Sequence, residues 1–136
     1  MRVFLDTNVL VSAFATRGLC RDLVARVVRE HEFLTSEIVI KEVRRVFKRK
    51  LKVDDATIEE TEAFLRNFHV ETQITELPAI SIADKSDIEV LGSAVAARAE
   101  VFITGDRELL ALGKAIRGLN ILDPRGFWEL GRGRYR

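Results

Sequence analysis

The sequence of 136 residues contains one cysteine, two prolines and two histidines. A single cysteine excludes an internal disulfide framework and a cysteine-rich zinc site, and we expect Cys20 to be a buried or half-buried thiol in a reducing compartment. No apolar run approaches the roughly 18 residues of a membrane span. An aspartate as early as Asp6 is foreign to the apolar core of a signal peptide. These absences predict a cytoplasmic protein without a membrane segment.

The composition is that of a folded domain. Hydrophobic residues make up 47% of the chain and charged residues 32%, which excludes intrinsic disorder. The formal net charge of +1 conceals an uneven distribution. Residues 1–53 carry twelve basic and six acidic side chains, whereas residues 54–108 carry four basic and thirteen acidic ones. This asymmetry predicts a positive surface beside a negative one.

Short apolar runs rich in β-branched and aromatic residues predict buried strands at 3–5 and 101–104. Further strand candidates lie at 33–35, 70–72 and 120–122. Helical patterns lie between them, at 9–15, 20–31, 37–50, 55–68, 87–99 and 107–116. This alternation predicts an α/β domain whose central, mostly parallel sheet is covered on both faces by helices.

We expect this domain to span residues 1–130 and a basic tail to follow over residues 131–136. Glycine alternates with arginine in the tail, which disfavours a helix and predicts a flexible segment. The tail is either a solvated terminus or a segment that contacts RNA through arginine and tyrosine.

Two carboxylates follow buried strands directly. Asp6 comes after the first strand and Asp106 after the fourth, and ligands of an open parallel sheet bind outside the carboxyl ends of its strands. Asn8 is placed to cap the next helix. Taken singly, either aspartate could instead accept hydrogen bonds from loop amides, but two of them in one small sheet favour a shared site.

Two further carboxylates lie on predicted helices. Glu42 projects beside the apolar stripe of its helix, where burial requires a positive partner, although it could also reach out to Lys41 or Arg45. Asp87 lies within Ser86-Asp87-Ile88-Glu89, which matches a capping box with Ser86 as the cap. Asp87 also points toward the packed side of its helix, and Asp84, one turn earlier, could join it.

A cluster of three or four carboxylates would repel itself without a cation. Oxygen-rich acidic sites suit Mg²⁺ or Mn²⁺, which often bridge to phosphate. The corresponding chemistry is hydrolysis of a phosphodiester bond. His31 and His69 each end a predicted helix, where we expect structural roles rather than metal ligation.

A positive segment lies next to Glu42. Residues 41–52 contain seven basic side chains and one acid, which is the electrostatic pattern of a nucleic-acid-binding face. A solvated helix face or a docking face for an acidic partner would look the same. The candidate RNA-binding residues are Lys41, Arg44, Arg45, Lys48 and Arg49.

The ordered series of motifs resembles the PIN-domain ribonucleases. The similar segments are Val3–Leu10, Ile40–Val43, Asp84–Ala94, Ala99–Leu110 and Ile121–Phe127, and together they cover nearly the whole chain. The resemblance implies a three-layer PIN fold and a metal-dependent endoribonuclease that is the toxin of a prokaryotic toxin–antitoxin pair. Such toxins are commonly homodimers neutralised by a small antitoxin protein.

By motif match, the resemblance assigns both catalysis and Mg²⁺ or Mn²⁺ binding to Asp6, Glu42, Asp87 and Asp106. Supporting roles fall to Asn8, Thr104 and Asp84. Two other classes of protein compete with this interpretation. A catalytically silent module could use the basic helix to hold RNA or an acidic partner. A phosphoacceptor domain of the response-regulator type would need paired acids after the first strand and a lysine near the last strand, which this sequence lacks.

Overall fold

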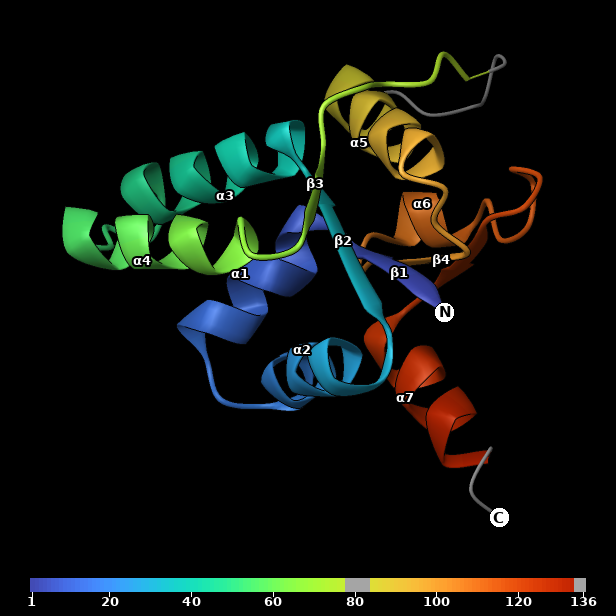
Figure 1. The fold of residues 1–136 in the computed structure, drawn as a ribbon, viewed down its shortest axis with the longest axis horizontal. Coiled ribbons are helices and arrows are strands. Elements are labelled where there is room, and N and C mark those ends of the chain that lie inside the picture. Colours follow the sequence, from blue (N-terminus) through green and yellow to red (C-terminus); the bar gives the residue numbers. More distant parts are fainter. Residues whose placement is uncertain (78–83, 134–136) are drawn as a thin grey trace.

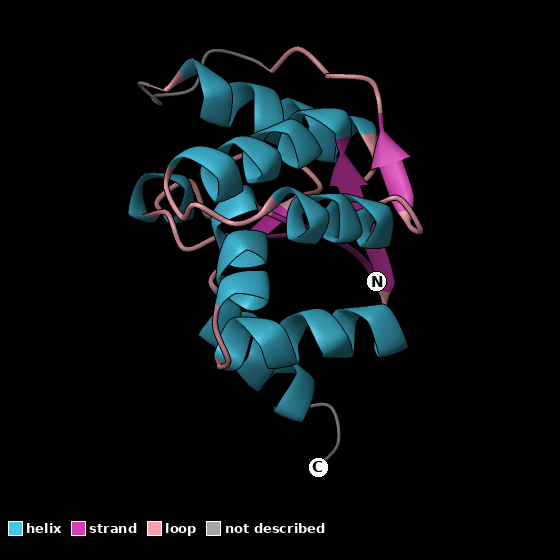
Figure 2. Cartoon of the chain, turned by 90° about the vertical axis from the view of Figure 1, so that its left-hand side faces the viewer, coloured by secondary structure: helices cyan, strands magenta, loops and turns pink. Residues whose placement is uncertain are grey.

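The computed structural model describes residues 1–77 and 84–133 as a parallel sheet flanked by helices (Figures 1 and 2). The elements in chain order are β1 (Arg2–Leu5), α1 (Thr7–Ala15), α2 (Leu19–Glu30), β2 (Glu32–Ser36), α3 (Glu37–Arg49), α4 (Asp55–Leu65), β3 (His69–Glu71), α5 (Lys85–Ala96), β4 (Val101–Ile103), α6 (Arg107–Leu110), β5 (Asn120–Leu122) and α7 (Pro124–Gly133).

The five strands are ordered β3-β2-β1-β4-β5, and every neighbouring pair is parallel. The chain therefore builds the sheet outward from β1 to β3 and then returns to place β4 on the other side of β1. In register, Leu5 of β1 stands opposite Ile103 of β4. This reversal of strand order beside β1 is the kind of position at which open parallel sheets bind ligands, and it is where Asp6 and Thr104 emerge.

The three inner strands, β1, β2 and β4, are largely buried because apolar side chains fill both faces of the sheet there, whereas the edge strand β3 is partly exposed. Val3, Phe4 and Leu5 are fully buried, and the Phe4 ring stacks on Phe102 of the neighbouring strand with centroids 5.6 Å apart. Two aromatic side chains from helices, Phe47 and Phe127, complete the core. This packing fixes the strand ends, and therefore the residues that follow them, in a rigid frame.

The α/β class and the parallel sheet flanked by helices agree with the sequence-based expectation, but several helix limits differ. The helix expected over 107–116 ends at Leu110, because the chain turns at Gly113, whose φ is +53°. The helix expected over 55–68 ends at Leu65, and the one expected over 87–99 spans Lys85–Ala96.

Helix α7 was not expected from the sequence, although a signal for it exists. Pro124 occupies the first helical position, which proline favours, and the Asp123 carboxylate accepts a hydrogen bond from Gly126 N at 2.7 Å. The helix continues through residues 131–133, the first half of the tail expected to be flexible. The remaining residues of that tail, 134–136, lie outside the described residues.

In the part of the chain that the structure describes, no helix combines the length and the apolar character needed to cross a membrane.

Candidate active site

Asp6 lies at the carboxyl end of β1 and is held from three directions. Its side chain accepts hydrogen bonds from Thr7 N at 2.8 Å, from Thr104 Oγ1 at 2.7 Å and from Asn8 Nδ2 at 3.1 Å. Its backbone N donates to Ile103 O at 2.9 Å, which ties β1 to β4. Asp6 itself is the N-cap of α1, so the expectation that Asn8 caps this helix is wrong.

Asn8 instead connects two strand ends. Its Oδ1 accepts a hydrogen bond from Gly105 N at 3.0 Å, while its Nδ2 donates to Asp6. Thr104 Oγ1 donates to Asp6 and also accepts from Asp106 N at 3.0 Å. Two of the three residues expected to support the acids, Asn8 and Thr104, therefore link the turn after β4 to the Asp6 carboxylate.

Glu42 projects from α3 between two hydroxyl groups. Its Oε1 accepts from Thr7 Oγ1 at 2.7 Å, and its Oε2 accepts from Ser86 Oγ. Glu42 forms no ion pair with any described residue, so the alternative in which it reaches Lys41 or Arg45 does not describe this structure. Three helices, α1, α3 and α5, meet at this one carboxylate.

Ser86 is free to reach Glu42 because another residue caps its helix. The cap of α5 is Asp84, whose Oδ1 accepts from Ser86 N at 2.8 Å, so the expected capping box with Ser86 as the cap is wrong. The sequence carries no signal for the Ser86–Glu42 contact, since the two residues lie 44 positions apart. Thr7, in contrast, could have been noticed as a hydroxyl residue next to Asp6.

Asp6, Glu42 and Asp87 line one hollow of about 460 Å³ at the carboxyl edge of the sheet. Its other lining residues come from α1 and from the end of α3, and they include the cationic side chain of Lys50 and the apolar side chain of Leu51. The structure therefore brings together three of the four acids expected at the site.

The fourth acid, Asp106, lies in a neighbouring hollow of about 350 Å³. It caps α6, and its Oδ1 accepts from Glu108 N at 2.8 Å. Asn8 and Ser12 line both hollows, which makes them the border between Asp106 and the other acids. Cys20 is half-buried, as expected, and lines the hollow that contains Asp106.

The environment of the acids disfavours negative charge. Burial raises the pKa of the Asp6 carboxyl to about 6, and the charges of Glu42 and Asp106 add to this, although the Thr104 and Thr7 hydrogen bonds act in the opposite direction. Burial also raises the pKa of Asp87 to about 6, with contributions from the charges of Asp84, Asp6, Asp106 and Glu42. The acids thus share one electrostatic field, even though Asp106 lies apart.

The donor set suits a hard divalent cation, because it consists of carboxylate oxygens and because no described basic residue forms an ion pair with Asp6, Glu42 or Asp87. Over the described ranges, however, no three His, Cys, Asp or Glu side chains are grouped so that they could hold an ion as they stand. Each Glu42 oxygen accepts a hydrogen bond from one hydroxyl group. The carboxylate oxygens are therefore of the right chemical type for a divalent cation, but the side chains in their present conformations do not form a complete set of metal ligands.

The two histidines lie away from the acids. The Met1 amino nitrogen lies 3.3 Å from His31 Nδ1, and the His31 ring packs edge-on against Phe127. His69 Nε2 lies 3.0 Å from Glu71 Oε1. Neither ring lines the acidic hollow.

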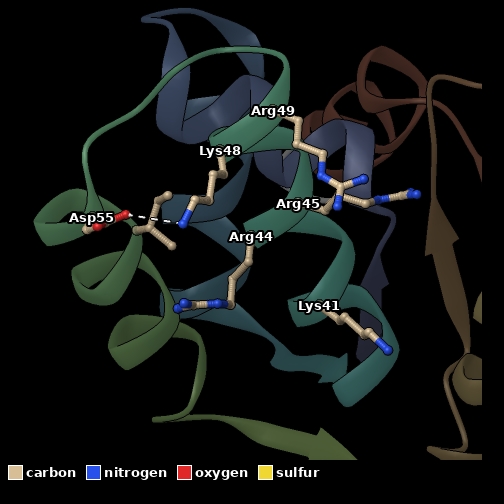
Figure 3. Close-up of a pocket in the computed structure, with 7 residues that line it drawn as sticks. Lys41, Arg44, Arg45, Lys48, Arg49 and Asp55 are labelled. Atoms are coloured by element: carbon tan, nitrogen blue, oxygen red, sulfur yellow. Dashed lines mark ion pairs between the residues drawn. The ribbon is translucent and has the colours of Figure 1, made fainter.

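The five candidate RNA-binding residues all lie on α3 and line a separate groove of about 310 Å³ (Figure 3). Asp55 and Ile58 of α4 form its other wall. The groove and the acidic hollow share one helix, since Glu42 and Val46 of α3 line the hollow.

The PIN domain family matches residues 2–108 of this sequence, and the chain therefore belongs to that family. PIN domains are generally nucleases. Among solved structures, the chain is similar to one from the crystal structure of VapBC2 from Rickettsia felis bound to a DNA fragment from their promoter. The TM-score is 0.65 at 18% sequence identity, with 90% of this chain and 98% of the other covered, which is a likeness of fold. No curated protein matches the sequence.

Proposed function

We propose that this protein is a metal-dependent endoribonuclease that hydrolyses RNA phosphodiester bonds. The observation that carries the proposal is the convergence of Asp6, Glu42 and Asp87, from three different elements, on one hollow at the carboxyl edge of the sheet. No described cation pairs with these acids. Burial raises the pKa of Asp6 and of Asp87, and the charges of the neighbouring acids add to this effect. A bound divalent cation would offset the repulsion between the charges of these acids, so a cluster of carboxylates without a cationic partner suits a metal site.

In this proposal Asp6, Glu42, Asp87 and Asp106 are the catalytic acids and would hold Mg²⁺ or Mn²⁺. Such an ion, when bound, activates a water molecule and stabilises the negative charge on the phosphate. Asn8 and Thr104 orient the Asp6 carboxylate through their hydrogen bonds. Asp84 caps α5 and so fixes the position of Asp87 within the first turn of that helix.

The substrate-binding part of the proposal rests on α3. Its basic side chains lie on the same helix as Glu42, so an RNA backbone attracted to this face would pass close to the acids. RNA in an unpaired conformation offers the exposed phosphates that such a surface can reach.

We further propose that the protein is a cytoplasmic toxin that dimerises and is neutralised by an antitoxin protein. Membership of the PIN domain family and the likeness to a chain of the VapBC2 toxin–antitoxin complex support this assignment.

The test is cleavage of a mixed RNA pool by the wild type and by Asp6→Asn, with Mg²⁺, with Mn²⁺ and with chelator. We expect metal-dependent cleavage that falls at least about 100-fold in Asp6→Asn, because loss of a ligand should cost no less than loss of an outer-shell partner. Asp22→Asn, an exposed change on α2, is the matched control and should cleave as the wild type does.

A second readout is independent of activity. Adding Mg²⁺ should raise the unfolding free energy of the wild type, since a ligand that binds only the folded state stabilises it, and should leave Asp6→Asn unchanged. RNA binding without cleavage under either metal would favour a catalytically silent RNA- or partner-binding module instead. Equal cleavage by the wild type and Asp6→Asn would remove Asp6 from the site.

A further inference from the structure

The five basic residues of the α3 groove differ in their partners. Arg44 Nη1 lies 2.9 Å from Glu59 Oε1 and 2.7 Å from Glu62 Oε1. Lys48 Nζ lies 3.9 Å from Asp55 Oδ1. These two side chains point toward α4 in Figure 3 and join the two helices. The charge of Arg44 is balanced by two acids of the same domain, and Lys48 lies at the limit of ion-pair distance from a third.

The other three cations form a separate row. Lys41, Arg45 and Arg49 are exposed and recur at every fourth position of α3, so that successive members rise by about 6 Å along the helix. Within the described ranges none of the three forms an ion pair. Figure 3 shows them pointing away from α4. We call these three residues the α3 row.

The α3 row leads to the acidic hollow. Arg49 follows Glu42 by seven positions, which places it two turns further along and only about 20° around the helix axis. Arg45 lies about 60° from Glu42 on the same side. Val46 and Lys50, on the adjacent stripe of the helix, line the hollow itself. Lys41, although next to Glu42 in the sequence, lies about 100° from it around the helix axis. A strand lying along the row would therefore come closest to the acidic hollow at the Arg49 end.

We propose that the α3 row is a phosphate track that binds the RNA strand delivered to the acids, whereas Arg44 and Lys48 serve the packing of α3 on α4. This inference rests on the proposed function and assigns its substrate-binding residues. Two of the three members are arginines, whose planar guanidinium binds phosphate oxygens in pairs.

The chemistry of the groove favours a nucleic-acid backbone over a protein partner. The central parts of protein interfaces are built around exposed aromatic and apolar side chains. Among the described residues that line this groove, the one apolar residue is Ile58, which is only 3% exposed, and the others are charged. Binding to a phosphate backbone needs only unpaired cations at regular spacing, which the α3 row supplies.

The experiment measures binding of a labelled single-stranded RNA of mixed sequence by fluorescence anisotropy, in chelator, over a series of salt concentrations. The logarithm of the association constant falls linearly with the logarithm of the salt concentration, and the triple variant Lys41→Gln/Arg45→Gln/Arg49→Gln should make this slope less negative by about 2. The affinity at 0.1 M salt should fall about 100-fold. The control Lys114→Gln/Arg117→Gln/Arg125→Gln removes the same charge from exposed positions elsewhere and should change the affinity less than about three-fold.

A second control lies on the same helix. Arg44→Gln should leave the salt slope unchanged, because its charge is already paired with Glu59 and Glu62. If Arg44→Gln made the salt slope less negative by as much as a single substitution in the α3 row does, Arg44 would also bind RNA, and its separation from the α3 row would be wrong. Unchanged RNA binding by the triple variant would overturn the proposal, and so would absence of RNA binding by the wild type. If the triple variant bound RNA normally but lost binding to polyglutamate, the row would be a docking surface for an acidic protein.

Cleavage assays with Mg²⁺ or Mn²⁺ separate this inference from the proposed function. Binding that depends on the α3 row, with no cleavage by the wild type, would retain the phosphate track and reject the nuclease. Metal-dependent cleavage that the triple variant performs with unchanged affinity would retain the nuclease and reject the track.

Discussion

At the scale of single residues, two effects act on the charged form of the Asp6 carboxylate. Hydrogen bonds from neutral donors favour it, and burial beside other acids disfavours it. A threonine hydroxyl, a backbone amide and an asparagine amide donate to it, yet the side chain is only 5% exposed and faces other acids. Neutral donors favour the charged form without neutralising it. Burial outweighs them, since the pKa rises to about 6.

This shift predicts the pH dependence of stability. The folded state binds the Asp6 proton more tightly than the unfolded state, in which the pKa of Asp6 is near 3.8. Protonation of Asp6 therefore contributes to the unfolding free energy in full well below about pH 4, and this contribution is lost as the pH rises through about 6. In chelator, the unfolding free energy of the wild type relative to Asp6→Asn should fall by about 2 kcal/mol between pH 4 and pH 7.5, because part of the titration of the unfolded state lies below pH 4. Urea unfolding of both proteins at the two pH values measures it.

The comparison cancels the titrating groups that do not feel the charge of Asp6, because both proteins contain them. Asp87 is the exception, since the charge of Asp6 raises its pKa, and the measured difference includes this coupling. Asp22→Asn, which changes an exposed carboxylate, should keep a constant difference from the wild type over the same range. Parallel pH profiles for the wild type and Asp6→Asn would contradict the raised pKa of Asp6. The hydrogen bonds that Asp6→Asn loses change its unfolding free energy by the same amount at every pH, so they do not affect the comparison of the two pH profiles.

At the scale of elements, the sequence predicted the strands well because buried runs such as Val3–Leu5 and Val101–Ile103 have no competing interpretation. Helix ends were less predictable, because several capping residues compete for them. Asp84 caps α5 where Ser86 was expected, and Asp6 caps α1 where Asn8 was expected. The positions of the acids followed from strand ends and helix faces. The hydroxyls that hold Glu42, and the separation of Asp106 into its own hollow, depend on packing between helices, which sequence spacing does not encode.

One such packing contact lies at Gly92 of α5. The extended segment after β3 crosses the helix there, and Thr75 N donates to Gly92 O at 3.0 Å. A Cβ at this position would lie 2.5 Å from Thr75 O and 2.7 Å from Ile74 Cγ2. Only glycine allows this close approach, which anchors the segment on the helix that carries Asp87.

We therefore expect Gly92→Ala to destabilise the protein by about 1–3 kcal/mol, the usual range for overpacking, although alanine is the better helix former by roughly 1 kcal/mol. Hydrogen exchange at the Thr75 amide should become faster, because the segment must move away from α5. Urea unfolding and exchange rates measure the two effects. Gly18→Ala is the control, since a Cβ there meets nothing within 4 Å, and it should be nearly neutral. A more stable Gly92→Ala with unchanged exchange would show that the contact is looser than described.

At the scale of the whole molecule, charge is divided between two surfaces that share α3. The basic side chains of this helix line one groove, and its Glu42 lines the acidic hollow beside it. A net charge of +1 therefore hides a local arrangement in which a polyanion is attracted close to a cluster of acids. Metal binding at the hollow would lower the repulsion that the acids present to such a substrate.

The domain also extends beyond the family match at residue 108, because the core continues past it. Ile121 of β5 is buried, and α7 places Phe127, which is 2% exposed, against the His31 ring. The guanidinium carbon of Arg26 on α2 lies 3.8 Å above the Trp128 ring of α7. Helix α7 thus packs against α2, while its first residue, Pro124, lines the hollow that contains Asp106.

This packing predicts different outcomes for two shortened chains. A chain ending at Asp123 lacks α7 and should lose at least about 3 kcal/mol of unfolding free energy, since removal of a buried phenylalanine side chain alone costs 3–5 kcal/mol. That loss is a large fraction of the 5–15 kcal/mol typical of a domain. A chain ending at Leu130 keeps Phe127 and Trp128 and should unfold within about 0.5 kcal/mol of the full chain. Urea unfolding followed by circular dichroism compares the three proteins. Equal stability of the chain ending at Asp123 would show that α7 is an accessory element, whereas a large loss at Leu130 would show that the basic tail belongs to the folded domain.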